Sequence, residues 1–158
     1  MNMKVNKVFI GLGSNLGDRN RYLSEALRKI DNFARIVAKS SIYETDPVGY
    51  KNQGMFLNMV VEVTTSLDSE ELLARLKKLE KEIGRQDGVM RFGPREIDLD
   101  ILIYGDEIVK NDSIEIPHPR MAERGFVLES LSEIAPDLIH PVLNKTILEL
   151  WTQLKLKN

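Results

Sequence analysis

The chain has 158 residues, 42% hydrophobic and 29% charged, a balance typical of one globular domain spanning residues 1–158. A net charge of −2 argues against a general role on nucleic acids or membrane surfaces, and the absence of cysteine excludes disulfides, thiolate metal sites and cysteine nucleophiles. No apolar run reaches the roughly 18 residues that span a bilayer, and no signal peptide is recognisable, so the sequence predicts a cytoplasmic protein.

The first half of the chain predicts a strand, a helix and two further strands. Apolar residues over 5–12 predict a buried strand, a glycine-rich turn follows at 13–18, and Asp18 is the expected N-cap of the next helix. Residues 34–43 predict a second strand, and a third resumes at about Met55. One proline and two glycines over 45–54 predict an exposed loop between them.

The second half predicts a long helix from about residue 66 to Gly84, an arginine-containing loop over 85–96 and a strand over 97–104. A short hairpin and helical segments over 121–134 and 145–154 follow. The order β-α-β-β-α-β over 5–104 predicts an α+β, ferredoxin-like fold, with an antiparallel sheet, both helices on one face, and a C-terminal hairpin and helical extension. Because this fold hosts many functions, the site must decide the function.

Asp98 and Asp100 are the most informative residues. They alternate with apolar residues in the predicted strand 97–104, so their side chains share one face about 7 Å apart. Two carboxylates aimed the same way suit magnesium, which keeps waters and shares its shell with substrate phosphates. The alternative is a pair of acids on a solvated strand face.

Three arginines, Arg85, Arg91 and Arg95, precede this pair on a glycine-containing loop. Guanidinium groups bind phosphate oxygens bidentately, so arginines beside a metal pair indicate a polyphosphate site. Surface ion pairing of these arginines with Glu96 and nearby acids is the alternative. His118 lacks the spacing to another histidine that zinc sites use, and a phosphate contact or a plain surface position both fit it.

The glycines over 11–17 match neither the phosphate-binding Gly-Lys-Ser/Thr loop nor the dinucleotide fingerprint, and they predict a structural turn. Six segments stand out in order along the chain: Gly13-Ser14-Asn15-Leu16-Gly17, Tyr43-Glu44-Thr45-Asp46-Pro47, Phe56-Leu57-Asn58, the block from Gly84-Arg85 to Asp100, Pro117-His118-Pro119-Arg120-Met121 and Arg124-Gly125-Phe126-Val127-Leu128. The fourth segment contains the specific run Gly93-Pro94-Arg95-Glu96-Ile97-Asp98-Leu99-Asp100-Ile101. With these segments in this order, the chain resembles the 6-hydroxymethyl-7,8-dihydropterin pyrophosphokinase family of folate biosynthesis over nearly its whole length.

The resemblance implies ATP as co-substrate and two Mg²⁺ ions held by Asp98 and Asp100, which bridge the ATP phosphates and the pterin hydroxyl. The resemblance also implies three further roles toward ATP. Arg85 and Arg95 neutralise its charge, His118 and Arg124 contact its phosphates, and Glu80 lines its pocket. The implied reaction is in-line attack of the pterin hydroxymethyl oxygen on the β-phosphorus, with AMP as the leaving group.

The pterin is implied to lie between the rings of Phe56 and Phe126. Its polar edge is read by Asn58 and by the backbone around Thr45, Pro47 and Val48. Loops 46–54 and 85–96 are implied to close over both substrates and exclude water. The expected partners are these small molecules alone, with no nucleic acid or membrane, and the expected state is a monomer.

Three other readings stay open at this point. A non-catalytic ferredoxin-like module needs neither the paired acids nor the arginine loop. An RNA-recognition domain needs exposed aromatics on the central strands, which the acidic pair opposes. A different phosphoryl or nucleotidyl transferase fits the spacing of acids and arginines equally well, because that spacing recognises polyphosphate rather than pterin.

Overall fold

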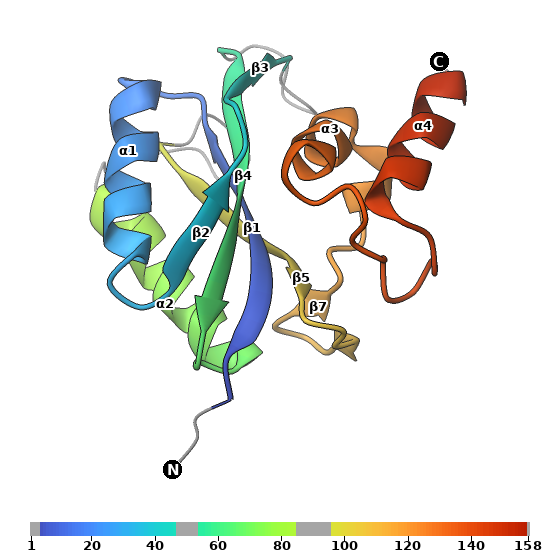
Figure 1. Cartoon of the computed structure of the whole chain (residues 1–158). Helices are drawn as coiled ribbons and strands as arrows, with labels where there is room; N and C mark the ends of the chain where they lie inside the picture. Colours follow the sequence, from blue (N-terminus) through green and yellow to red (C-terminus); the bar gives the residue numbers. More distant parts are fainter. Residues whose placement is uncertain (1–3, 47–53, 85–95, 158) are drawn as a thin grey trace.

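The structure is a computed structural model that describes residues 4–46, 54–84 and 96–157 (Figure 1). The first part of the chain forms the elements β1 (Asn6–Ser14), α1 (Arg19–Ile30), β2 (Arg35–Lys39), β3 (Tyr43–Thr45), β4 (Phe56–Thr65), α2 (Ser69–Ile83) and β5 (Asp98–Tyr104). The remainder forms β6 (Val109–Lys110), β7 (Glu115–Ile116), the 3₁₀ turn η1 (Met121–Glu123), α3 (Gly125–Ile134) and α4 (Ile147–Lys157).

The main sheet has the strand order β2-β4-β1-β5, with β3 paired to the start of β4, and every pairing is antiparallel. Each helix of the β-α-β units therefore connects two strands separated by a third. This is the split arrangement expected from the sequence, and the predicted ferredoxin-like α+β fold is confirmed. The predicted hairpin after β5 is also present, as the pair β6 and β7.

Helices cover both faces of the sheet, as Figure 1 shows: α1 and α2 lie on one side, α3 and α4 on the other. The first face and its two helices share a core that includes Val8, Ile10, Leu23, Ala26, Val61, Leu72, Leu76 and Leu99. The second face and the C-terminal helices share another, made of Phe9, Val60, Leu102, Ile103, Met121, Val127, Leu128, Leu131, Ile147 and Leu150. The C-terminal extension therefore has its own apolar contact with the sheet.

The two long helices begin where the sequence provides caps. The Asp18 carboxylate accepts a hydrogen bond from the Arg21 N–H at 3.2 Å, as predicted. At the start of α2, Asp68 accepts from the Glu71 N–H at 2.8 Å, and the Glu71 carboxylate accepts from the Asp68 N–H at 3.0 Å. Gly84 caps the end of α2, also as predicted.

The glycine-rich segment differs from the prediction, because β1 continues through Gly13 and Ser14 instead of turning at Gly13. Both neighbouring strands extend this far, since Gly13 pairs with Asn58 on β4 and with Asp98 on β5. Ladder hydrogen bonds outweigh the local turn preference of glycine here. The left-handed backbone of the turn falls later, at Gly17 with φ of 71°.

The strand predicted over 34–43 is interrupted. β2 ends at Lys39 and β3 begins at Tyr43. At the break, the Ser40 hydroxyl accepts from the Val60 N–H at 2.9 Å, and the Ser40 N–H donates to the Val60 carbonyl, also at 2.9 Å. A side chain thus replaces a backbone partner and allows the chain to change direction.

The predicted C-terminal helices also have different ends. The helix expected over 121–134 is divided, because Arg124 is extended between η1 and α3. The helix expected over 145–154 runs from Ile147 to Lys157. It begins there because Thr146 and Glu149 exchange side-chain-to-backbone hydrogen bonds of 3.0 and 3.1 Å, a capping box.

Candidate active site

The end of the sheet where β1, β4 and β5 meet brings together residues that the sequence placed far apart. Gly13 pairs with Asn58 on one side and with Asp98 on the other. Directly paired residues of antiparallel strands project to the same face. Asn58 and Asp98 therefore stand on one face of the sheet, separated by a residue that has no side chain.

The next set of paired residues on the same face, two positions along the strands, shows which face of the sheet carries Asn58 and Asp98. Gly11 pairs with Val60 and with Asp100, and Val60 belongs to the second core, on the side of α3 and α4. Leu102, two residues after Asp100, belongs to the same core. Because strand residues alternate, Asp98 and Asp100 both point to this face, as the sequence analysis predicted. Asp98 is half-buried and Asp100 is exposed.

Gly13 is needed for this arrangement. A Cβ at Gly13 would lie 3.0 Å from the Asn58 Oδ1 and 3.5 Å from the Phe56 Cδ1. The first distance is tighter than an ordinary contact, so even a methyl group would displace the Asn58 amide, whereas the second is an ordinary van der Waals contact. The absence of a side chain at Gly13 therefore leaves the space that the Asn58 amide occupies.

Thr45, Phe56 and Asn58 form one side of the site. Thr45 on β3 pairs with Phe56 on β4, and the Asn58 side-chain amide donates to the Thr45 hydroxyl at 2.6 Å. This bond fixes the rotamer of Asn58, whose side chain is buried. Pro47 and Val48, also predicted to face the pterin, lie outside the described residues.

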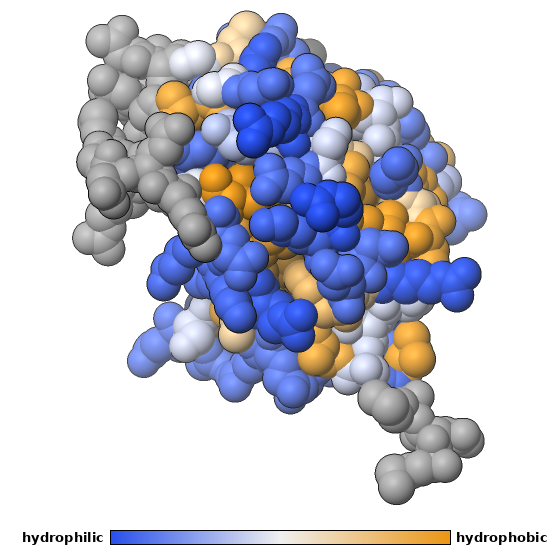
Figure 2. All heavy atoms as spheres, turned by 90° about the vertical axis from the view of Figure 1, so that its left-hand side faces the viewer, coloured by the Kyte–Doolittle hydropathy of each residue, from blue (hydrophilic) through white to orange (hydrophobic). Residues whose placement is uncertain are grey.

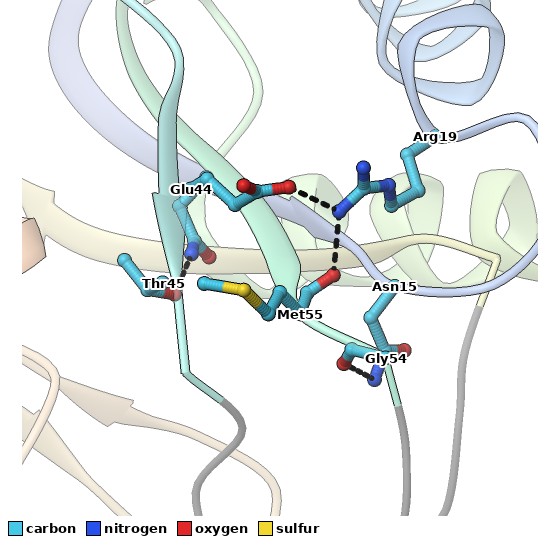
Figure 3. A network of polar contacts seen from close by, with 7 residues as sticks. Asn15, Arg19, Glu44, Thr45, Gly54 and Met55 are labelled. Atoms are coloured by element: carbon cyan, nitrogen blue, oxygen red, sulfur yellow. Dashed lines mark hydrogen bonds and ion pairs between the residues drawn. The ribbon is translucent and has the colours of Figure 1, made fainter.

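Contacts that the sequence analysis did not predict fix the ends of the connection between β3 and β4 (Figure 3). Arg19 donates to the Glu44 carboxylate at 2.9 Å and to the Met55 carbonyl at 2.8 Å. The Asn15 side-chain amide donates to the Gly54 carbonyl at 3.2 Å. Arg19 stands at the N-terminal, positive end of α1, where a cation is unfavourable. An arginine at this position of the predicted helix is the one sequence signal that its side chain has a partner elsewhere.

Glu80 connects α2 to the strand that carries the two aspartates. Its carboxylate accepts from the Leu99 N–H at 2.8 Å, on the backbone between Asp98 and Asp100. Burial raises the pKa of the Glu80 carboxyl, and the charges of Asp98 and Asp100 raise it further, against the lowering effect of the Leu99 N–H and of Lys77. The carboxyl groups of Glu80, Asp98 and Asp100 therefore lie close enough to influence one another at this point of the sheet.

His118 and Arg124 come to the same region from the C-terminal extension. The His118 N–H donates to the Leu102 carbonyl at 2.8 Å, two residues beyond Asp100 on β5. Burial lowers the pKa of His118, the charges of Arg124 and Arg120 lower it further, and Asp100 raises it. Its Nδ1 accepts from the Arg120 N–H at 3.2 Å, so the neutral ring carries its proton on Nε2 and can donate from there.

Phe126 lies in the first turn of α3, is half-buried and packs against the second core. Phe56, on β4, is half-buried as well. A pterin between these two rings stays a prediction. Arg85 and Arg95, the two arginines predicted to neutralise ATP, lie outside the described residues.

A second unpredicted contact, made by Glu133 on α3, holds the segment before β3. Its carboxylate accepts from the Ser41 N–H at 2.9 and 3.0 Å, from the Ser41 hydroxyl at 2.7 Å and from the Tyr43 hydroxyl at 2.9 Å. These bonds lower the pKa of Glu133. The C-terminal extension is thereby joined to the strand that supplies Thr45.

Comparison with known proteins identifies the family. Residues 9–136 match the family described as 7,8-dihydro-6-hydroxymethylpterin-pyrophosphokinase, or HPPK. The chain belongs to this family. HPPK enzymes use ATP as co-substrate.

Two bacterial relatives cover most of the chain. A 2-amino-4-hydroxy-6-hydroxymethyldihydropteridine pyrophosphokinase from Aquifex aeolicus is 44% identical over 150 residues, which are 95% of this chain and 93% of that protein. A protein of the same name from Bacillus subtilis is 50% identical over 131 residues, or 82% of this chain and 78% of the relative.

Solved structures of larger proteins share the fold. HPPK-DHPS from Plasmodium falciparum superposes with a TM-score of 0.77 at 20% identity, over 95% of this chain. The wild-type protein with pterin and p-hydroxybenzoate gives a TM-score of 0.76 at 21% identity. This chain spans less than half of each, 44% and 43%, so these likenesses concern the fold of the HPPK part. In the part of the chain that the structure describes, no helix is long and apolar enough to cross a membrane.

Proposed function

We propose that this HPPK transfers a pyrophosphoryl group from ATP to 6-hydroxymethyl-7,8-dihydropterin, giving AMP and the pterin diphosphate, by magnesium-assisted in-line attack on the β-phosphorus. Pyrophosphoryl transfer in folate biosynthesis is the activity of the family. The observation that carries the mechanism is the placement of Asp98 and Asp100 on one face of β5, in the same rows as Gly13 and Gly11 and beside Asn58.

Two aspartates suit the proposed metal. Magnesium prefers oxygen ligands and is commonly held by one or two carboxylates together with substrate phosphates and waters. Among the described residues, no three or more His, Cys, Asp or Glu side chains are grouped as a metal site, so the proposal assigns the remaining ligands to ATP and water. Burial is the main cause of the raised pKa of Glu80, but Asp98 and Asp100 also raise it, so the three carboxyl groups lie near one another and bound cations would offset their charge. Two Mg²⁺ ions would neutralise the phosphates and orient the β-phosphorus.

The proposed phosphate contacts come from the C-terminal extension and from the arginine loop. His118 would donate from Nε2, and Arg124 would add positive charge beside it. Arg85 and Arg95 are assigned the same role on sequence grounds, because guanidinium groups stabilise the charge that builds up during phosphoryl transfer. Glu80 would act by holding the backbone of β5, so that the spacing of the two aspartates is fixed.

The proposed pterin site is the face around Asn58. Its side-chain amide has one proton engaged by Thr45, and the carbonyl oxygen lies toward Gly13. The amide group can therefore read a polar ring edge while it stays fixed in place. The proposal places the pterin ring between Phe56 and Phe126, with the backbone around Thr45, Pro47 and Val48 completing the recognition.

We further propose that residues 1–158 form one domain that acts as a monomer in the cytoplasm. The absence of cysteine supports a reducing compartment. Sedimentation of the purified chain, with and without both substrates, tests the monomer.

The reaction is tested by ³¹P NMR of the protein with ATP, Mg²⁺ and 6-hydroxymethyl-7,8-dihydropterin. Asp98→Asn and Asp100→Asn keep side-chain shape and remove charge, and Asp106→Asn, an exposed position in the turn after β5, is the matched control. We expect AMP and a pterin diphosphate from wild type and control, with turnover lost from the two site variants. ADP as product would identify a simple phosphotransferase, and pterin binding without turnover would identify a binding module.

A further inference from the structure

A cavity lies outside the proposed active site, in the layer formed by α1 and α2. Its volume is about 220 Å³, and it is lined by Arg28, Lys29, Asn32, Phe33, Arg75, Lys78, Leu79 and Glu82. Figure 2 faces the side of the molecule that carries α1, and hydrophilic residues cover most of that side. Asn58, Asp98 and Asp100 project from the other face of the sheet, so the sheet itself separates them from the cavity. Glu80, which contacts the backbone of β5 from α2, lies on the cavity's side of the sheet.

The lining is strongly basic in a chain whose net charge is −2. Arg28 and Lys29 come from the last turn of α1, and Arg75 and Lys78 come from α2. Glu82 is the single acid of the lining. Four cations from two helices therefore face one acid.

Ion pairs within the described residues satisfy one of these four cations. Lys29 lies 3.6 Å from the Glu25 carboxylate and 3.8 Å from that of Glu82. Arg28, Arg75 and Lys78 have no acid within 4.0 Å in the described part of the chain. The helix dipole places about half a negative charge at the C-terminal end of α1. This partial charge offsets only part of the positive charge of the four cations, so the lining of the cavity keeps a net positive charge.

Two of the lining residues hold each other in place. The Arg75 guanidinium lies over the ring of Phe33, 4.6 Å from its centroid. Phe33 is held in turn by its backbone, whose carbonyl accepts from the Thr65 hydroxyl at 3.0 Å and whose N–H donates to the Ile30 carbonyl at 3.0 Å. Arg75 is thereby pre-oriented, so less conformational entropy is lost when an anion binds to it.

We propose that this cavity binds a small phosphate-bearing anion of the size of inorganic diphosphate, at a site separate from the active site. Arginine and lysine side chains approach the cavity from two helices. A ligand with linked phosphates suits them better than a ligand with a single carboxylate, because each phosphate accepts several charge-assisted hydrogen bonds. The volume equals that of roughly seven water molecules at about 30 Å³ each, which suits a short phosphate chain.

The test is a titration of ¹⁵N-labelled protein with inorganic diphosphate, followed by amide chemical shifts. Three proteins are compared: wild type, the double variant Arg28→Gln with Lys78→Gln, and Lys81→Gln, an exposed lysine of α2 outside the cavity. We expect saturable shifts over 28–33 and 75–79 in wild type. The double variant should bind there at least about tenfold more weakly, and the control within about twofold.

Other outcomes would overturn the proposal. These are an absence of saturable shifts over the two segments, an equal loss in the Lys81→Gln control, or the same shifts from sodium chloride at matched ionic strength. Sulfate binding as tightly as diphosphate would refute the assignment to a phosphate chain. Shifts around His118 and Arg124 report diphosphate at the active site and should persist in all three proteins. Thermal unfolding checks that each variant is folded, and Lys78→Gln alone replaces the double variant if that one is not.

Discussion

Replacing Gly13 by alanine tests how closely the site is packed. The new Cβ would stand 3.0 Å from the Asn58 Oδ1 and 3.5 Å from Phe56, so Asn58 must rotate away by a few tenths of an ångström. Gly11→Ala is the matched control, because Gly11 lies on the same strand and face, and a Cβ there meets Leu102 at an ordinary 3.5 Å. The comparison isolates the displacement of Asn58 from the general effect of alanine in a strand.

The expected magnitude follows from the rotation. A rotation of about 30° from a rotamer costs about 0.5–1.5 kcal/mol, and a shift of a few tenths of an ångström is a smaller rotation, so this range is an upper limit. Since about 1.4 kcal/mol is a tenfold change in affinity, Gly13→Ala should weaken pterin binding measurably, by up to about tenfold, while both variants remain folded. Fluorescence titration with the pterin, alongside urea unfolding, measures both quantities. Unchanged pterin affinity in Gly13→Ala, or an equal loss in Gly11→Ala, would refute the reasoning.

Three further predictions concern contacts around the site and in the extension. His140→Asn should remove a pH-dependent loss of stability. Burial lowers the pKa of His140, so its contribution to the free energy of unfolding is complete above about pH 6.5 and is lost as the pH falls through the lowered folded-state pKa. Urea unfolding at a series of pH values should therefore show a dependence on pH in wild type that is missing from the variant. Glu133→Ala should lower the free energy of unfolding by about 1–2 kcal/mol, because it removes the acceptor that joins α3 to the segment before β3. Glu133→Gln should lower the free energy of unfolding by a smaller amount. Equal stability of wild type and both variants would contradict this. Arg19→Gln should weaken pterin binding by roughly fivefold, because it removes two hydrogen bonds that together contribute about 1 kcal/mol. Arg21→Gln, at an exposed position on the same helix, is the control and should bind the pterin like wild type.

The fold was predictable because its periodic signals agree along the whole chain. Alternation in the strands and apolar stripes in the helices gave the correct order of elements, and Asp18 and Gly84 marked helix ends correctly. The errors fall where tertiary partners outweigh local preference. Gly13 continues a strand because two neighbouring strands extend beside it, and Ser40 breaks one because its hydroxyl takes a backbone N–H.

The candidate site was predictable in part for the same reason. The common direction of Asp98 and Asp100 follows from strand geometry alone. The roles of Arg19 and Glu133 do not, because each reaches residues more than twenty positions away, and nothing local signals the partner of Glu133. The sequence allows Glu96 as a surface partner for the loop arginines, yet its side chain is buried, with 4% exposed, and its Oε2 lies 3.1 Å from where a Cβ on Gly84 would stand.

The second core has a consequence for synthesis on the ribosome. All five strands of the central sheet are available once residue 104 has been made, but Phe9, Val60 and Leu102 are covered by residues from 121 to 150. A nascent chain that ends before α3 therefore presents an apolar sheet face to the solvent. Such a face attracts chaperones or other nascent chains, so we expect slow translation or early termination in this last third to cause aggregation rather than a smaller working enzyme.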